Sequence, residues 1–161
     1  MTIHNIPPVY DKNSRILILG SFPSVKSREA EFFYGHPQNR FWRVLASIVG
    51  AKAPNSIEGK REFLLSHGIA VWDVIASCEI EGSADNTIRA VQPNDISVIL
   101  SSADIRAIFV NGRTSEKYYN KFVKEAIGRE AILLPSTSPA NAAVSLDALI
   151  EAWGVIKEYI L

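Results

Sequence analysis

Four short, almost entirely apolar runs determine what this chain can fold into. They occupy residues 15–19, 69–72, 106–110 and 130–134. Runs of about five residues that are rich in Ile, Leu and Val and lack polar alternation are typical of strands buried on both faces. Longer stretches with helical periodicity lie between the runs. The chain is therefore predicted to be an α/β protein, with a four-stranded parallel sheet between two layers of helices.

The predicted helices occupy residues 39–49, 57–67, 94–102, 114–127 and 146–160. For the four strands, counted along the chain, we expect the spatial order 2-1-3-4. With 161 residues, of which 47% are hydrophobic and 21% charged, the chain fits one domain over residues 1–161. We expect a monomer, because the apolar side of the last predicted helix packs on the sheet and no apolar stripe is left unexplained.

Charge and cysteine content exclude several kinds of site. The 17 Lys and Arg residues balance the 17 Asp and Glu residues, so nucleic-acid binding would need a local basic patch, to which Lys26 and Arg28 could contribute. The single cysteine, Cys78, excludes an internal disulfide and a multi-cysteine zinc site. We expect no metal or other cofactor. The chain contains no segment long enough to span a membrane and opens without a signal pattern, so a cytoplasmic protein is expected.

Small polar residues follow every predicted strand. Ligands of open α/β sheets bind beyond the carboxyl ends of the strands, where the strand order reverses. The candidate segments are Gly20-Ser-Phe-Pro-Ser24, then Asp73 with a polar loop over residues 77–87, then residues 111–115 and 135–141. Each segment alone has an ordinary explanation in turn geometry. Together they predict a pocket for a flat, polar, ring-shaped ligand.

Three segments resemble the motif regions of the uracil-DNA glycosylase superfamily. They are Gly20-Ser-Phe-Pro-Ser24, Tyr34-Gly-His-Pro-Gln-Asn-Arg-Phe-Trp42 and Ser136-Thr-Ser-Pro-Ala-Asn-Ala142. The combination is most similar to the hypoxanthine-DNA (deoxyinosine) glycosylase branch, and the resemblance covers the whole chain. It implies a monofunctional enzyme of base excision repair that acts on DNA containing a deaminated base. Such an enzyme flips hypoxanthine, and also uracil or xanthine, out of the duplex and hydrolyses the glycosidic bond.

Two departures from the superfamily pattern shift the predicted chemistry. Phe22 occupies the position of the catalytic Asn of the mismatch-specific enzymes, and Ser136 stands where the uracil-specific enzymes have a His. We therefore predict that Asn39 is the catalytic residue, because its carboxamide offers both a donor and an acceptor. The alternative for Asn39 is a helix cap, since Asn is favoured just before a helix begins.

Four residues are predicted to bind the flipped base. The resemblance makes Tyr34 the aromatic that stacks on the base, with the main-chain amides of Ser21 and Phe22 facing a base oxygen. Asp73 would accept a hydrogen bond from the base or position water. The alternatives are a buried core tyrosine and a turn-capping aspartate. His36, Phe41 and Trp42 are interpreted as structural.

The remaining predicted site residues would contact the DNA itself. The tip of the last loop would wedge into the vacated base stack, and its hydroxyls would bind phosphate. The residues are Ser136, Thr137, Ser138, Pro139, Ala140 and Asn141. Asn111 and Arg113 would meet a phosphate where a helix begins. The alternatives are a plain helix start and an ordinary turn capped by Ser145.

Two other functions are compatible with the sequence. One is a catalytically silent protein of the same fold that binds DNA, which the Phe22 replacement favours. The other is a small-molecule nucleoside- or nucleotide-binding α/β domain, which zero net charge would suit.

Overall fold

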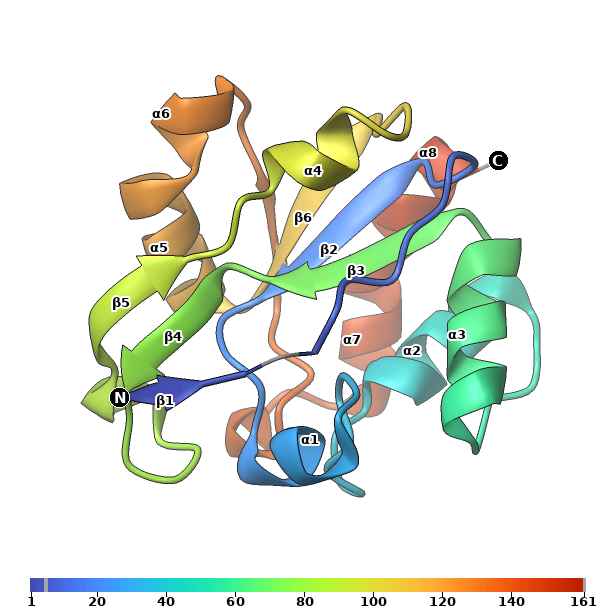
Figure 1. Cartoon of the computed structure of the whole chain (residues 1–161). Coiled ribbons are helices and arrows are strands. Elements are labelled where there is room, and N and C mark those ends of the chain that lie inside the picture. The colour runs from blue at the N-terminus through green and yellow to red at the C-terminus, as the bar shows by residue number, and fades with distance from the viewer. Residues whose placement is uncertain (5, 161) are drawn as a thin grey trace.

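The centre of the protein is a parallel sheet of four strands (Figure 1). The computed structural model describes residues 1–4 and 6–160. The strands lie in the spatial order β3 (Ile69–Asp73), β2 (Ile16–Gly20), β6 (Ala107–Asn111) and β7 (Ile132–Leu134). All five residues of β2 are buried, as expected for a strand covered on both faces. The predicted α/β fold with four parallel strands is confirmed.

Helices cover both faces of this sheet, and β2 contributes to a core on each side. Ile16 and Ile18 belong to one core, and Leu17 and Leu19 belong to the other, because successive side chains of a strand alternate. The first core is covered by α2 (Phe41–Val49), α3 (Ile57–Ser66), α7 (Leu146–Trp153) and α8 (Lys157–Ile160). The second is covered by α4 (Ser97–Leu100), α5 (Arg113–Phe122) and α6 (Lys124–Ile127). The predicted three layers are confirmed.

A second sheet, which the sequence did not lead us to expect, begins just after β3. It is antiparallel, with the order β1 (Thr2–Ile3), β4 (Ile75–Glu79), β5 (Arg89–Pro93). The predicted loop over residues 77–87 is wrong at its start, where the chain still belongs to β4. The strand was missed because only Ile75 and Cys78 of β4 are buried, so the run lacks a strand's regular alternation. The parallel sheet reads 3-2-6-7 in the numbering of all strands described, because β1, β4 and β5 enter the count. In the numbering of the four predicted strands alone, the same arrangement reads 2-1-3-4.

The chain passes from one sheet to the other at Val74. Its N–H donates to the carbonyl of Gly20 (2.8 Å), and the N–H of Ile75 donates to the carbonyl of Ser21 (3.1 Å). The turn that follows β2 therefore remains bonded to the β3–β4 junction. Asp73, the last residue of β3, lies at this crossing point.

Several predicted helices are shorter or divided. The helix expected over residues 114–127 ends at Phe122 and restarts as α6, and the one expected over residues 146–160 is divided by the 3-10 turn η3 (Gly154–Ile156). The helix expected over residues 94–102 is reduced to α4, because the Asp95 carboxylate accepts from the N–H of Ser97 and ends the preceding extended segment. The other short elements are α1 (Val25–Ala30), η1 (Asp85–Thr87) and η2 (Pro139–Asn141). Within residues 1–4 and 6–160, every helix is too short or too polar to cross a membrane.

Candidate active site

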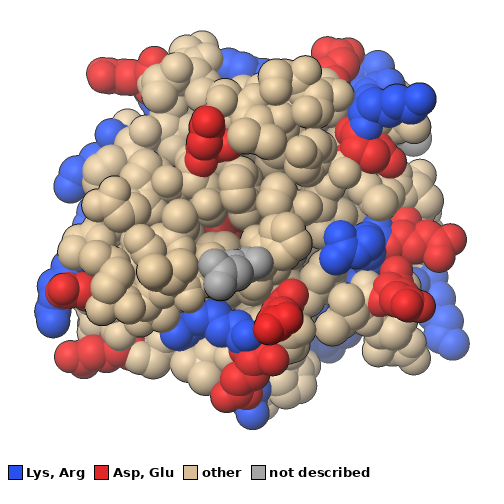
Figure 2. Space-filling view, viewed as in Figure 1, with Lys and Arg blue, Asp and Glu red and all other residues tan. Residues whose placement is uncertain are grey.

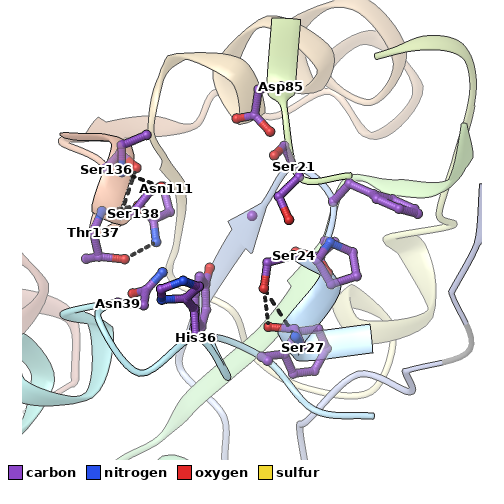
Figure 3. Close-up of a pocket in the computed structure, with 18 of the residues that line it drawn as sticks. Ser21, Ser24, Ser27, His36, Asn39, Asp85, Asn111, Ser136, Thr137 and Ser138 are labelled. Atoms are coloured by element: carbon purple, nitrogen blue, oxygen red, sulfur yellow. Dashed lines mark hydrogen bonds between the residues drawn. The ribbon is translucent and has the colours of Figure 1, made fainter. Parts of the chain in front are cut away.

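A cavity of about 280 Å³ opens at the carboxyl ends of β2, β3 and β6 (Figure 3). Its volume is close to the lower end of small-molecule sites, about 300 Å³. It brings together the predicted site residues except two, Arg113 and Asn141. Those that line it are Ser21, Phe22, Tyr34, Asn39, Asp73, Asn111, Ser136, Thr137, Ser138, Pro139 and Ala140. Arg113 and Asn141 lie along a neighbouring groove, which also includes Asn111 and Ser136.

The turn after β2 is held to the loop that carries Tyr34 by two serines. Ser24 caps α1 by accepting from the N–H of Ser27 (3.1 Å), and the Ser27 hydroxyl accepts from the N–H of Gly35 (2.9 Å). Ser27 is almost completely buried. One polar side chain therefore fixes the spacing between two walls of the cavity, both visible in Figure 3.

The ring of Phe22 is buried in the second core. It meets the His4 ring edge-on, with ring centroids 5.2 Å apart, and the Arg28 guanidinium lies 5.4 Å from its centroid. The same guanidinium donates to the carbonyls of Pro23 and Gly82. Arg28, which we expected in a basic DNA-binding patch, is thus occupied in holding the first turn against the β4–β5 loop.

Tyr34 has an unusual backbone and one covered ring face. Its φ of 51° lies in the left-handed region, which is uncommon for a residue other than glycine. The ring stacks on Phe41 at a centroid distance of 3.8 Å, and the carbonyl of Tyr34 accepts from the indole N–H of Trp42. Only the ring face opposite Phe41 can receive another planar group. Burial, followed by the nearby Asp73 carboxyl, raises the pKa of the Tyr34 hydroxyl.

Gly20 allows two polar side chains to approach the same point of the backbone. A Cβ on this residue would lie 2.5 Å from Oδ1 of Asp73 and 3.1 Å from the hydroxyl of Tyr34. Asp73 is 3% exposed, and its Oδ2 has no hydrogen-bond partner in the part of the chain described. Burial raises the pKa of Asp73 to about 7.

We expect Gly20→Ala to displace the Asp73 carboxyl group. The buried carboxyl has little room to move, so overpacking should reduce the free energy of unfolding by about 1–3 kcal/mol. Urea denaturation measures this change. Gly154→Ala is the matched control, because a Cβ there meets no atom within 4 Å. Equal stability of Gly20→Ala and the parent would show that the cavity floor is not tightly packed.

Asn39, one residue before the N-cap Arg40, hydrogen-bonds the first N–H of α2 and also lines the cavity. Its Oδ1 accepts from the N–H of Phe41 (3.0 Å), so the helix-cap alternative describes a real contact. The contact uses the oxygen of the carboxamide and leaves the Nδ2 amide group as the donor on the cavity side of the helix start. His36, its neighbour in Figure 3, accepts from the N–H of Gln38 through Nδ1, which agrees with a structural part.

The last loop is fixed by a reciprocal pair of hydrogen bonds. Asn111, at the end of β6, donates from Nδ2 to the Thr137 hydroxyl and accepts from the Thr137 N–H, both at 3.1 Å. Asn141 turns inward, where its amide donates to the carbonyl of Ser136 (2.9 Å). Ser145 caps α7 by accepting from the N–H of Ala148, as the alternative interpretation expected. The loop is therefore a well-ordered wall of the cavity.

Arg40 is a site residue that the sequence did not reveal. Its guanidinium donates to the carbonyls of Asn141 and Val144, and its N–H donates to the carbonyl of Thr137. These acceptors lie about a hundred positions away and are main-chain oxygens, so no side-chain motif indicates them. The β4–β5 loop adds Ser83 and Asp85 to the cavity wall. Both lie in the polar loop over residues 77–87, which was a candidate segment, but neither residue was predicted individually.

Arg40→Met should loosen the last loop. Loss of two hydrogen bonds from a charged donor is expected to lower the free energy of unfolding by about 2 kcal/mol. Amide hydrogen exchange should accelerate over residues 137–144 more than elsewhere. Arg43→Met, on the exposed side of α2, is the control. Unchanged exchange in Arg40→Met would mean that the loop does not depend on this anchor.

The charged side chains do not form a field of one sign. Lys and Arg are interspersed with Asp and Glu around the face seen in Figure 2, consistent with the zero net charge. Over residues 1–4 and 6–160, the chain has no cluster of three or more His, Cys, Asp or Glu suited to a metal ion. The chemistry available at the cavity is that of amides, hydroxyls, a phenol, an imidazole and carboxyl groups.

Comparison with known proteins gives one family. The family profile described as "Uracil DNA glycosylase superfamily" matches residues 7–156. A relative from Methanosarcina barkeri named hypoxanthine DNA glycosylase is 36% identical over 155 residues, covering 95% of this chain and 96% of its own. One of the same name from Methanosarcina acetivorans is 35% identical over 147 residues, covering 90% and 92%.

A solved structure extends the match to three dimensions. It is a solution NMR structure from Methanosarcina acetivorans, described provisionally as a uracil DNA glycosylase. The two folds superpose with a TM-score of 0.83 at 34% identity, covering 97% of this chain and 96% of the other. Sequence and fold agree over nearly the whole length. The chain belongs to the uracil DNA glycosylase superfamily.

Proposed function

We propose that this protein is a monofunctional DNA glycosylase that removes deaminated bases, with hypoxanthine as the principal substrate, and leaves an abasic site. The observation that carries the proposal is the cavity at the strand ends, where Asn39, Tyr34 and the turn after Gly20 surround a space of ligand size. The names of the two Methanosarcina relatives support hypoxanthine as the base. A monomer is part of the proposal, because the apolar sides of the C-terminal helices α7 and α8 pack into the first core.

The substrate base would have to leave the duplex to reach this cavity. Enzymes that act on a base extrude the nucleotide and hold it by stacking and by hydrogen bonds along its polar edge. In the proposed complex, the base stacks on the face of Tyr34 opposite Phe41. The main-chain amides of Ser21 and Phe22 then meet a base oxygen.

Asn39 would stabilise the base as it departs. Breaking the bond between C1′ and the base nitrogen leaves negative charge on the base, and donors aimed at that charge accelerate the step. The capping contact to Phe41 supports this proposal, because it turns the carboxamide so that its N–H group is the one left for the base. Asn39 can therefore hold the start of the helix through its oxygen and act in catalysis through its amide group.

The last loop would contact the DNA. Ser138, Pro139, Ala140 and Asn141 would fill the gap left by the flipped nucleotide, at a cost of a few kcal/mol of unstacking. Ser136 and Arg113 would meet phosphate oxygens along the neighbouring groove. The bonds between Asn111 and Thr137 support this arrangement by keeping the loop in one conformation.

The decisive experiment uses duplexes that carry one hypoxanthine, uracil or xanthine, with an undamaged duplex as control. We expect alkali-sensitive abasic sites in the hypoxanthine duplex and none in the control. Binding of damaged duplex without an abasic product would identify a silent DNA-binding protein instead. Affinity for free nucleosides without affinity for any duplex would identify a nucleotide-binding domain.

A further inference from the structure

We propose that Asp73 is the general acid of the reaction, entering the cavity protonated and giving its proton to the departing base. The inference rests on the proposed glycosylase function and adds a step to it. It follows from how the carboxyl group is buried, from what faces it, and from what a departing base requires.

The carboxyl group of Asp73 lies at the cavity wall, and one of its two oxygens is buried. Asp73 lines the cavity, and its Oδ1 packs over the Cα of Gly20. Its Oδ2 is buried without a hydrogen-bond partner among the residues described. The backbone on either side is fixed, because the carbonyl of Asp73 accepts from the side-chain amide of Asn94 and the next N–H donates to Gly20. These bonds hold the Cα of Asp73 in place at the cavity wall.

His4, a titratable neighbour of Asp73, is arranged as a neutral donor. Its Nδ1 accepts from the N–H of Ile6 (3.3 Å), so the ring proton is on Nε2, which faces the carbonyl of Ile75 at 2.9 Å. The Oδ2 of Asp73 is 3.8 Å from the same nitrogen. Burial is the main cause that lowers the pKa of His4. His4 therefore supplies no positive charge to hold Asp73 ionised.

The other groups around Asp73 do not supply a cation either. Tyr34 presents a phenol, and the Arg28 guanidinium is bonded to the main-chain carbonyls of Pro23 and Gly82 and packs on the ring of Phe22. A buried carboxyl without a positive partner favours its neutral form. The raised pKa of about 7 for Asp73 agrees with this geometry. Asp85 and His36 line the same cavity, and burial raises the pKa of Asp85 as well.

A protonated carboxyl can complete the reaction that Asn39 begins. The C1′–N bond breaks, its electron pair goes to the base, and the proton moves from Asp73 to the base. Water then adds to C1′, and the proton it releases returns to the Asp73 carboxylate. The balance is one water consumed, with a neutral base and an abasic sugar formed. A general acid of this kind contributes about 10²–10⁴-fold, and it works best when its pKa is near the pH of the reaction.

Single-turnover excision of hypoxanthine between about pH 5 and pH 9 tests the assignment. The parental rate constant should be level below about pH 7 and fall about tenfold per pH unit above it. Asp73→Asn should be about 10²–10⁴-fold slower at low pH and should lose the alkaline decline. His4→Ala should move the decline to lower pH, because water then reaches Oδ2. Asp85→Asn and His36→Gln should keep the decline, whatever their rates.

A direct titration keeps the proposal testable if Asp73→Asn does not fold. The ¹³C shift of the Asp73 carboxyl carbon in the parental protein should titrate near pH 7. Titration in the ordinary range of aspartate, or an alkaline decline that persists in Asp73→Asn, would overturn the assignment. Excision with a level pH profile would overturn this inference alone. Absence of excision from every damaged duplex would overturn the proposed function as well.

Discussion

Asn39→Asp is expected to slow single-turnover base excision by about 10²–10³-fold while leaving the protein as stable as its parent. Loss of one donor that faces a developing negative charge has an effect of about this size. The new carboxylate retains an oxygen for the N–H of Phe41, and a negative charge just before the N-terminus of α2 is favourable. Rate and stability should therefore separate in this variant. Quenched-flow excision and thermal denaturation measure the two quantities.

Two comparison variants show which part of Asn39 matters. Asn39→Ala removes donor and cap together and should lose about 1 kcal/mol of stability in addition to the rate. Ser56→Ala removes the cap of α3, away from the cavity, and should lose similar stability with an unchanged rate. If Asn39→Asp excises hypoxanthine at the parental rate, the residue is a helix cap and not catalytic.

The second large effect concerns stability and pH. The folded protein holds the proton of Asp73 up to about pH 7, whereas the ordinary pKa of an aspartate is 3.8. The contribution of this group is therefore full below about pH 4 and is lost as the pH rises to about 7. At about 1.4 kcal/mol per pKa unit, the loss should be about 4 kcal/mol.

Asp73→Asn isolates the contribution of the Asp73 carboxyl to the pH dependence of stability, because the asparagine side chain does not titrate. The difference in free energy of unfolding between parent and variant, measured by urea denaturation from about pH 4 to pH 8, should shift against the parent as the pH rises. Asp104→Asn, at an exposed carboxyl, controls for the removal of a charge. A difference that does not vary with pH would mean that Asp73 ionises in the folded state as it does in the unfolded chain.

The fold was predictable where apolar residues are continuous. The four buried strands follow directly from such runs, whereas β4 and β5 are half exposed and carry no regular pattern. The predicted positions of several helix ends were inaccurate for a related reason. Local competitors such as the Asp95 carboxylate, and the interruption at Gly154–Ile156, act over two or three residues. Hydrophobic periodicity, which is averaged over a longer stretch of sequence, does not reveal these local effects.

The site was predictable as a set of segments but not as a set of contacts. The strand-end rule and the family resemblance indicated the turn after β2, Asn39 and the last loop. They could not indicate that Asn39 would share its carboxamide between a helix and the cavity. Nor could they indicate Arg40 or His4, whose partners are main-chain oxygens and a buried carboxyl far along the sequence. Such partners exist only once the chain is folded.

The reciprocal bonds between Asn111, the last residue of β6, and Thr137 extend the contact between these two chain segments past the end of β7. They act like one more pair of hydrogen bonds between neighbouring strands, with the Asn111 side chain in place of the backbone. With Arg40 on its other side, the loop would lose little conformational entropy on the proposed contact with DNA, a difference of about 0.5–1.5 kcal/mol for each side chain already immobilised. A stiff loop also presents the same edge to every base pair it passes. Discrimination would then depend on how readily each pair opens, which favours mispaired hypoxanthine before any group in the cavity has touched it.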